Sequence, residues 1–368
     1  MTSPAAIDLE AFGWSDAWAG AHASHAALGR EPARVLAEDR GSYQLVGMAG
    51  EVRGAVTGRF RFEADEEASR FPSVGDWVAV QGGLVGETVI HAVLPRRTAL
   101  VRQAAGPRTA AQVVGANLDV VFVVASLNAD LNVRRLERYL AAAWESGAEP
   151  VVLLTKTDLR SATEIDDALV TVAGVAAGAT VLAVSAIDGR GLKEVASRIG
   201  AGRTAAFVGS SGVGKSTLLN RLAGSEIAAT AEVREDDARG RHTTRRRELH
   251  LVPDVGLILD TPGMRELALW DGDGLERSFI DIDSLVAECR FGNCSHGGEP
   301  GCAIAAALAD GRLDPDRHAS WRKLQRETAH QERRVDAVAR AAEKRKWKQI
   351  GKSVSRHMDA KYGTNGWR

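Results

Sequence analysis

The pattern of apolar and polar positions changes twice along the chain. From residue 41 to about residue 100, short runs alternate apolar and polar residues between glycines, which is typical of a small closed β-barrel. From about residue 101 to residue 270, apolar runs alternate with helical segments, which predicts a wound, mostly parallel α/β sheet. The predicted strands of this sheet are residues 120–124, 151–154, 181–184, 205–208 and 257–259.

The two ends of the chain carry weaker patterns. Residues 1–40 show few strand signals, so we expect an N-terminal extension that is either a short helical segment or a partly ordered arm. Residues 271–330 hold a Cys/His cluster and helical spacing, which predicts a mostly helical, metal-binding domain. Residues 331–368 form a basic tail, in which the segment 340–356 holds seven Lys or Arg against one acid.

One predicted helix is readable in detail. Asn132 is a candidate N-cap, Leu136, Leu140 and Ala143 share one face, and Gly147 is a stop signal. We expect this helix to cover the sheet.

Composition limits the possible classes of protein. A chain of 368 residues predicts two or three domains, and 47 Lys plus Arg against 48 Asp plus Glu leave no overall basic field for nucleic acid. The chain carries neither a signal-peptide pattern nor a long apolar run, so we expect a cytoplasmic protein without membrane contact. We also expect a monomer.

A phosphate-binding loop follows the predicted strand 205–208 and precedes a helical pattern. Its glycines allow backbone N–H groups to surround a β-phosphate, Lys215 reaches the β- and γ-phosphates, and the Ser216 hydroxyl is a Mg²⁺ ligand. The loop comprises Gly209, Ser210, Ser211, Gly212, Val213, Gly214, Lys215, Ser216 and Thr217.

A guanine-binding segment precedes this loop in the sequence. Thr155, Lys156 and Asp158 follow a predicted strand, and the Asp158 carboxylate suits the N1–H and exocyclic amine of guanine, which adenine lacks. The backbone at Ser185 and Ala186 is predicted to donate to the guanine carbonyl. Because the phosphate loop leads in an ordinary GTPase, the reversed order here indicates a circular permutation, which leaves such a site intact when termini lie close together.

Two further segments complete the predicted site. Asp260 ends an apolar strand, where it would hold Mg²⁺ through water, and Gly263 follows it in an Asp-Thr-Pro-Gly turn. In the basic segment 239–247, either Thr243 or Thr244 completes the Mg²⁺ coordination, and the sequence does not choose between them. His242 is the candidate catalytic residue because imidazole can hydrogen-bond the attacking water; the alternative is a surface histidine among arginines.

Three thiolates and one imidazole lie within one short window. Cys289, Cys294, His296 and Cys302 form the ligand set of a closed structural zinc site, since an odd number of cysteines speaks against a disulfide framework. The basic segment 340–356, which contains Trp347, suits contact with RNA phosphates and an exposed base, although a charge run is also compatible with a solvated helix.

The permuted order, the Gly-Arg-His-Thr-Thr segment at 240–244 and the cysteine pattern ending at Cys302 resemble the ribosome small-subunit-dependent GTPase family (RsgA/YjeQ) over about residues 41–330. The resemblance implies an OB-fold RNA-binding domain at 41–100, a circularly permuted GTPase domain at 101–270 and a zinc-binding domain at 271–330. It implies late maturation of the small ribosomal subunit through its rRNA, with hydrolysis of GTP to GDP that the subunit stimulates. It also implies a role for His242 in hydrolysis. The residue after Gly263 is Met264, whose thioether cannot orient water, so we expect a slow intrinsic rate. Thr155 replaces the usual Asn, from which we expect a modest loss of base affinity.

Two alternatives belong to other classes. A GTP-sensing RNA-binding module would show little catalysis, and subunit-stimulated turnover separates it from a GTPase. An ATP-using kinase or helicase would have no need of Asp158.

Overall fold

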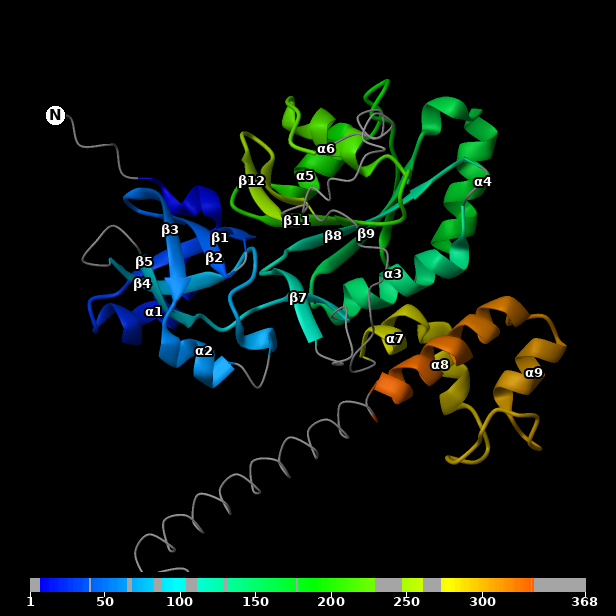
Figure 1. Ribbon diagram of the computed structural model, residues 1–368. Coiled ribbons are helices and arrows are strands. Elements are labelled where there is room, and N and C mark those ends of the chain that lie inside the picture. The colour runs from blue at the N-terminus through cyan, green and yellow to red at the C-terminus, as the bar shows by residue number, and fades with distance from the viewer. Residues whose placement is uncertain are drawn as a thin grey trace, which may run out of the picture.

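Figure 1 shows the computed structural model, in which a barrel, a helix-covered sheet and a group of C-terminal helices follow one another. The structure describes residues 7–39, 41–64, 68–82, 88–103, 111–128, 131–176, 178–228, 247–260, 273–331 and 333. Within these ranges, none of the helices has the length and apolar character needed to cross a membrane.

Five strands form the predicted barrel. They pair in the order β1-β2-β3-β5-β4, and β4 pairs back to β1, so the sheet closes on itself as in an OB-fold. Alternate residues face an apolar interior that includes Tyr43, Leu45 and Ile90. The strands are β1 (Glu31–Asp39), β2 (Ser42–Gly47), β3 (Gly50–Val56), β4 (Trp77–Gly82) and β5 (Thr88–Val93), with α2 (Gly58–Ala64) and η2 (Ala68–Arg70) between β3 and β4.

The barrel begins ten residues earlier than residue 41, where the pattern of the sequence places its start, because residues 31–39 form β1. This strand lies between β2 and β4 and carries Pro32, which has no amide hydrogen, and Arg34, which is buried. Both residue types are rare inside a central strand, so the sequence gives no strand signal there. Before β1, η1 (Leu9–Phe12) and α1 (Asp16–Ala26) are ordered elements of the predicted extension. The other predicted domain boundaries stay predictions.

The second sheet confirms all five predicted strands. It has the order β10-β9-β8-β11-β13-β12, in which β12 alone is antiparallel to its neighbour. Its strands are β8 (Val120–Ser126), β9 (Glu149–Thr155), β10 (Thr180–Ala183), β11 (Thr204–Val208), β12 (Glu248–Val252) and β13 (Gly256–Asp260). β12 also pairs with β1 through Ala37 and Glu248, so this sheet and the barrel are continuous. A separate hairpin of β6 (Ala99–Gln103) and β7 (Ala111–Ala116) connects the two in sequence.

Helices cover both faces of this sheet (Figure 1). α3 (Val133–Glu145) and α4 (Ala162–Ala173) pack on one face, and α5 (Leu192–Ile199) and α6 (Lys215–Ala223) pack on the other. α3 confirms the helix predicted in detail, because the Asn132 side chain accepts a hydrogen bond from the Arg135 backbone N–H and Gly147 adopts φ 82° just past the end. η3 (Thr157–Leu159) follows β9.

The C-terminal helices pack against α3. They are α7 (Asp273–Ser278), α8 (Ile280–Ala287), α9 (Ala303–Ala309) and a helix over residues 315–331. Asp314 caps the last of these, since its carboxylate accepts the Asp316 backbone N–H at 3.0 Å. Trp321 and Leu324, spaced for a helix in the sequence, are buried in the core that these helices share with α3.

Candidate nucleotide site and metal centre

The segments predicted to bind GTP meet at one edge of the parallel sheet. β9, β10, β11 and β13 point the same way, so their carboxyl ends carry Thr155, Ser185, Gly209 and Asp260 to a common edge. In open parallel sheets this is the edge at which ligands bind. The reversed order of the signatures in the sequence therefore leaves them neighbours in space.

The phosphate loop runs from the end of β11 to the start of α6. Gly209, Gly212 and Gly214 have φ values of 151°, 79° and 93°, which a residue with a Cβ adopts only with strain. A Cβ on Gly209 would lie 2.3 Å from the backbone oxygen of Val124. Lys215 folds its ammonium back into the loop and donates to the carbonyl oxygens of Gly209 and Ser210, at 2.8 and 2.5 Å. The loop thus curls around the Lys215 ammonium group at the N-terminus of α6.

Thr155 joins the guanine-binding segment to the phosphate loop. Its buried hydroxyl lies 2.6 Å from the Val213 carbonyl oxygen, to which it donates, and 3.2 Å from the Ala125 carbonyl oxygen. The threonine side chain is shorter than the asparagine usual at this position, and its hydroxyl supplies the donor that holds the two segments together. The next residue, Lys156, adopts φ 62°, which turns the chain sharply toward Asp158.

Ser185 orients the carboxylate of Asp158, which is predicted to read guanine. Its fully buried hydroxyl donates to Asp158 Oδ1 at 2.7 Å and accepts the backbone N–H groups of Ile187 and Asp188 at 3.1 and 3.3 Å. The backbone N–H of Ser185 itself donates to the Arg190 carbonyl oxygen at 3.0 Å. The backbone N–H of Ser185, one of the two predicted donors to the guanine base, is therefore already used in a hydrogen bond within the protein.

Asp260 ends β13 beside the phosphate loop. β13 pairs in parallel with β11, and Asp260 lies opposite Glu248 of β12. Ser216 and Thr217 lie in the first turn of α6. The remaining predicted site residues, His242, Thr243, Thr244 and Gly263, fall outside the described residues, as does the basic segment 340–356.

α3 contacts both the phosphate loop and the C-terminal helices, which the sequence does not predict. The Arg135 guanidinium donates to the Ser210 hydroxyl at 2.9 Å. One turn further on, Arg138 forms a two-point ion pair with Glu327, at 2.6 and 2.9 Å. The helical spacing places these arginines on the surface, but their partners are 75 and 189 residues away in the sequence and carry no signal of the contact.

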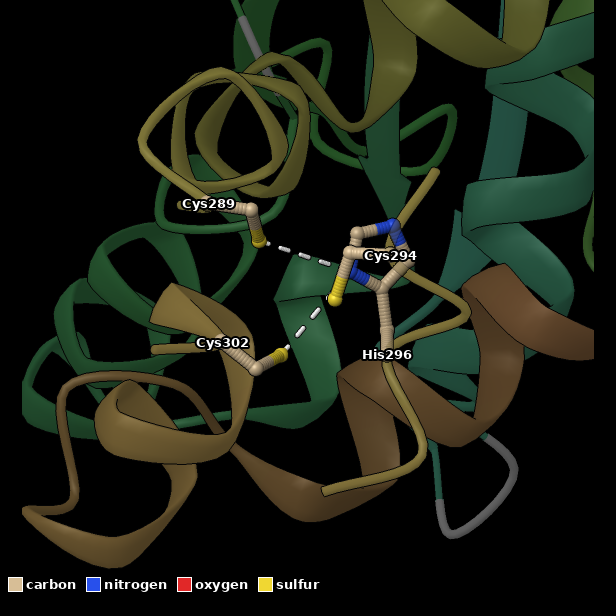
Figure 2. A group of neighbouring side chains, drawn as sticks. All are labelled: Cys289, Cys294, His296 and Cys302. Carbon is tan, nitrogen blue, oxygen red and sulfur yellow. Dashed lines mark hydrogen bonds between the residues drawn. The ribbon is translucent and has the colours of Figure 1, made fainter. Parts of the chain in front are cut away.

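The predicted metal ligands converge on one point (Figure 2). The ligand atoms of Cys289, Cys294, His296 and Cys302 all lie within 4.8 Å of one another. The Cys289 and Cys302 sulfurs lie 3.6 and 3.9 Å from His296 Nδ1. Ligands at zinc bond lengths in a tetrahedron are separated by about 3.5 to 3.8 Å, so the cluster has the size of one four-coordinate ion.

The surrounding contacts hold these ligands in place. The sulfur of Cys302 caps α9 by accepting the Ala305 backbone N–H at 3.4 Å. His296 adopts φ 57°, and its ring packs against Trp321 with 5.9 Å between centroids. Glu299 accepts the backbone N–H groups of Ser295 and Gly297, at 3.0 and 2.8 Å, which closes the loop between the ligands. The residues present therefore fit a structural metal ion.

Comparison with known proteins agrees with this architecture. Residues 93–270 match the family model described as RsgA GTPase. The chain is 45% identical over 357 residues to "Small ribosomal subunit biogenesis GTPase RsgA" of Opitutus terrae, covering 94% of this chain and 96% of that protein. It is 41% identical to the protein of the same description from Streptomyces coelicolor, covering 96% of each.

Two solved structures share the fold at low sequence identity. The crystal structure of YjeQ from Thermotoga maritima superposes with a TM-score of 0.61 at 23% identity, covering 82% of this chain and 99% of that one. YloQ, described as a circularly permuted GTPase, gives a TM-score of 0.58 at 23% identity, covering 82% and 96%.

The barrel, the permuted sheet and the shared edge of base and phosphate segments define a circularly permuted P-loop GTPase. At 45% identity over nearly the whole length, the chain belongs to the RsgA GTPase family.

Proposed function

We propose that this protein binds GTP at the carboxyl edge of its sheet, hydrolyses it, and assists late maturation of the small ribosomal subunit. The chain aligns over almost the full length of relatives that are named small ribosomal subunit biogenesis GTPases. This likeness supports the biological role. The observation that carries the chemistry is the hydrogen bond from Thr155 to Val213, because it fixes the base-reading and phosphate segments at one site.

Each end of the nucleotide has its own residues. Asp158 would accept the guanine N1–H and amine, the Ala186 backbone N–H would donate to the guanine oxygen, and Lys156 would lie along the base. The N–H groups of the phosphate loop and Lys215 would surround the phosphates. Asp158 selects guanine because adenine presents an acceptor where guanine presents N1–H.

Oxygen donors suitable for Mg²⁺ lie beside this loop. Ser216 would ligate the ion directly and Asp260 through water, with Thr243 or Thr244 completing the set. The ion supplies charge neutralisation at the β- and γ-phosphates.

His242 is our candidate for orienting the attacking water. The residue after Gly263 is Met264, whose thioether cannot hold a water as a glutamine does, so slow intrinsic turnover is expected. His242→Ala should keep nucleotide affinity and lower turnover; unchanged turnover with bound subunit would remove the assignment.

We propose that the Cys/His cluster holds one structural Zn²⁺, because three thiolates and an imidazole match its ligand preference and leave no open position. The protein would act as a cytoplasmic monomer. Its barrel, its metal-bearing helices and its basic tail would contact ribosomal RNA.

One experiment tests this function: hydrolysis of GTP and of ATP, measured with and without purified small subunits. We expect GTP turnover to rise about tenfold or more with the subunit, and ATP to be a poor substrate throughout. If the protein binds GTP while bound to the subunit, and turnover does not rise, it is instead a nucleotide-sensing module. Equal use of ATP would contradict the role of Asp158.

A further inference from the structure

A cavity lies at the sheet edge opposite the predicted nucleotide site. It has a volume of about 450 Å³ and is formed where the N-terminal segment meets the barrel and the amino ends of β8 and β11. Its lining includes Trp14, Trp18 and three arginines, Arg34, Arg97 and Arg203. None of these residues takes part in the GTP site.

Arg34 brings a buried positive charge to this cavity and makes no direct ion pair with a carboxylate among the described residues. Its side chain projects from β1, and the residue is only 2% exposed. It donates to the Thr204 hydroxyl at 2.8 Å, to the carbonyl oxygens of Gly75 and Asn117 at 3.3 and 3.4 Å, and to that of Phe12. All four acceptors are neutral, and no ion pair of Arg34 is found among the described residues. The carboxylates of Asp119 and Asp76 act on this charge from beyond ion-pair distance and partly offset the lowering of the Arg34 pKa by burial. A buried guanidinium without a direct ion pair still favours an anion nearby.

The other two arginines stand at the accessible part of the cavity. Arg97 is exposed, lies over the Trp18 ring at 4.5 Å from its centroid, and donates to the Ser15 hydroxyl at 3.4 Å. It has no carboxylate within ion-pair distance in the described part of the chain. Arg203 lies 4.0 Å from Asp119 and 3.8 Å from Glu149, which is too far for strong pairing.

The charges that line the cavity leave an excess of one positive charge. Its carboxylates are Asp119 and Glu10, against the three guanidinium groups. Asp119 also accepts the backbone N–H of Thr204 at 2.7 Å, which fixes the position of its carboxylate. The lining therefore favours an anion over a cation.

Close backbone packing builds one wall of the cavity. Gly13 and Gly202 have φ values of 84° and 70°, and a Cβ on Gly13 would lie 2.5 Å from the Gly202 carbonyl oxygen. The N-terminal segment is thus fitted against the turn that precedes β11. A side chain at either glycine would push the segment away and open the wall.

We propose that this cavity binds a phosphate group of a single RNA strand, with Arg97 and Arg203 as its direct contacts and Trp14 beside the attached nucleoside. The volume is within the range of small-ligand sites and is far larger than one phosphate ion needs, and an indole next to guanidinium groups suits a nucleotide. The inference rests on the proposed ribosomal role, which supplies the RNA. It places an RNA contact where the barrel meets the GTPase sheet.

The test uses the full chain and a fluorescently labelled single-stranded oligoribonucleotide, with binding followed by anisotropy over a range of salt concentrations. The double variant R97A/R203A should bind about tenfold more weakly, and the slope of log K against log salt should fall by about 1.4, for two contacts to a single strand. R97K/R203K should recover much of the affinity. R312A, which removes an exposed arginine paired with Asp310 on the C-terminal helices, is the matched control and should change neither quantity.

Two results would overturn the proposal. One is an unchanged affinity and salt slope in the double variant. The other is loss of inorganic phosphate binding without loss of oligoribonucleotide binding, which would identify a site for free phosphate. GTP hydrolysis in the same variants should stay normal, since the cavity lies at the other edge of the sheet. A protein that fails as a GTPase but retains this RNA contact would separate the two claims.

Discussion

The hydroxyl of Thr155 donates to the carbonyl oxygen of Val213 at 2.6 Å, although the two residues are 58 positions apart. In the folded protein this bond joins the segment predicted to read the base to the loop predicted to hold the phosphates. Thr155, which stands where an asparagine is usual, provides the donor of this bond.

Removal of this hydroxyl should weaken nucleotide binding. Thr155→Val keeps the shape of the side chain and leaves the Val213 oxygen without its donor, at a cost of about 1 kcal/mol or a five- to tenfold loss in GDP affinity. Titration with a fluorescent GDP analogue measures this loss of affinity. Thr157→Val is the matched control, because the Thr157 hydroxyl is buried without a hydrogen-bond partner in the described structure. Equal losses in both variants would show that the Thr155 bond has no special role.

Replacing one carboxylate oxygen of Asp158 with an amide nitrogen should change which base the protein prefers. Asp158→Asn replaces an acceptor with a donor, so GTP affinity should fall about 100-fold and binding of xanthosine triphosphate should rise. Ser185→Ala removes the bond to Asp158 Oδ1 and should lower affinity for GTP without this change of preference. Competition between the two nucleotides provides the measurement, and a variant that still prefers GTP would contradict the assignment of Asp158.

A buried ion-pair network fastens the C-terminal helices to α3. Arg317, 6% exposed, donates to Glu137 at 2.9 Å and to Asp281 at 2.7 and 2.6 Å, and Glu137 is fully buried. Arg317→Met should destabilise the protein by about 3 kcal/mol because the buried Glu137 loses this ion pair and keeps the one with Arg134, at 2.7 Å. Urea denaturation followed by circular dichroism tests this. Arg312→Ala should leave the midpoint unchanged, since that arginine is exposed.

Stability should depend on pH through Asp283. Burial, with Glu276 and Asp281 nearby, raises the pKa of Asp283 to about 6, while the carboxyl titrates near 4 when unfolded. Ionisation therefore opposes folding: the penalty is absent below pH 4, grows as pH rises, and is complete above pH 6. Arg322 and Arg326 line a pocket together with Asp283 and Glu276.

Asp283→Asn should accordingly raise the free energy of unfolding by about 1 kcal/mol at pH 7.5, after allowance for solvent screening, and leave it unchanged at pH 4. Unfolding curves at the two pH values supply the comparison. A gain of the same size at both would show that ionisation is not its cause.

Metal removal should act on the C-terminal helices first. The thiol of Cys302 caps α9 and the ring of His296 packs on Trp321, so loss of the ion would loosen α9 and the 315–331 helix. A strong chelator should release one zinc per chain and lower the thermal midpoint, and GDP affinity should change little. Release of no zinc, or of another metal, would contradict the proposed ion.

How far the fold follows from the sequence depends on the kind of signal. Buried parallel strands such as β8 and β11 are continuous apolar runs, and α3 carries its own cap and stop, so both are predictable. β1 is not, because Pro32 and Arg34 interrupt its pattern and its strand character comes from neighbours on both sides.

The site divides in the same way. The phosphate loop and the Cys/His cluster are local in sequence, so their spacing predicts their geometry. The Thr155 and Arg135 contacts join residues 58 and 75 positions apart, and side-chain partners at that separation are decided by the fold.

The most direct measurement of the central claim is a crystal structure with a non-hydrolysable GTP analogue and Mg²⁺. We expect one nucleotide with its guanine on Asp158, its phosphates within the loop around Lys215, and the Thr155–Val213 bond retained. A nucleotide whose base lies away from Asp158 while its phosphates occupy the loop would contradict the account.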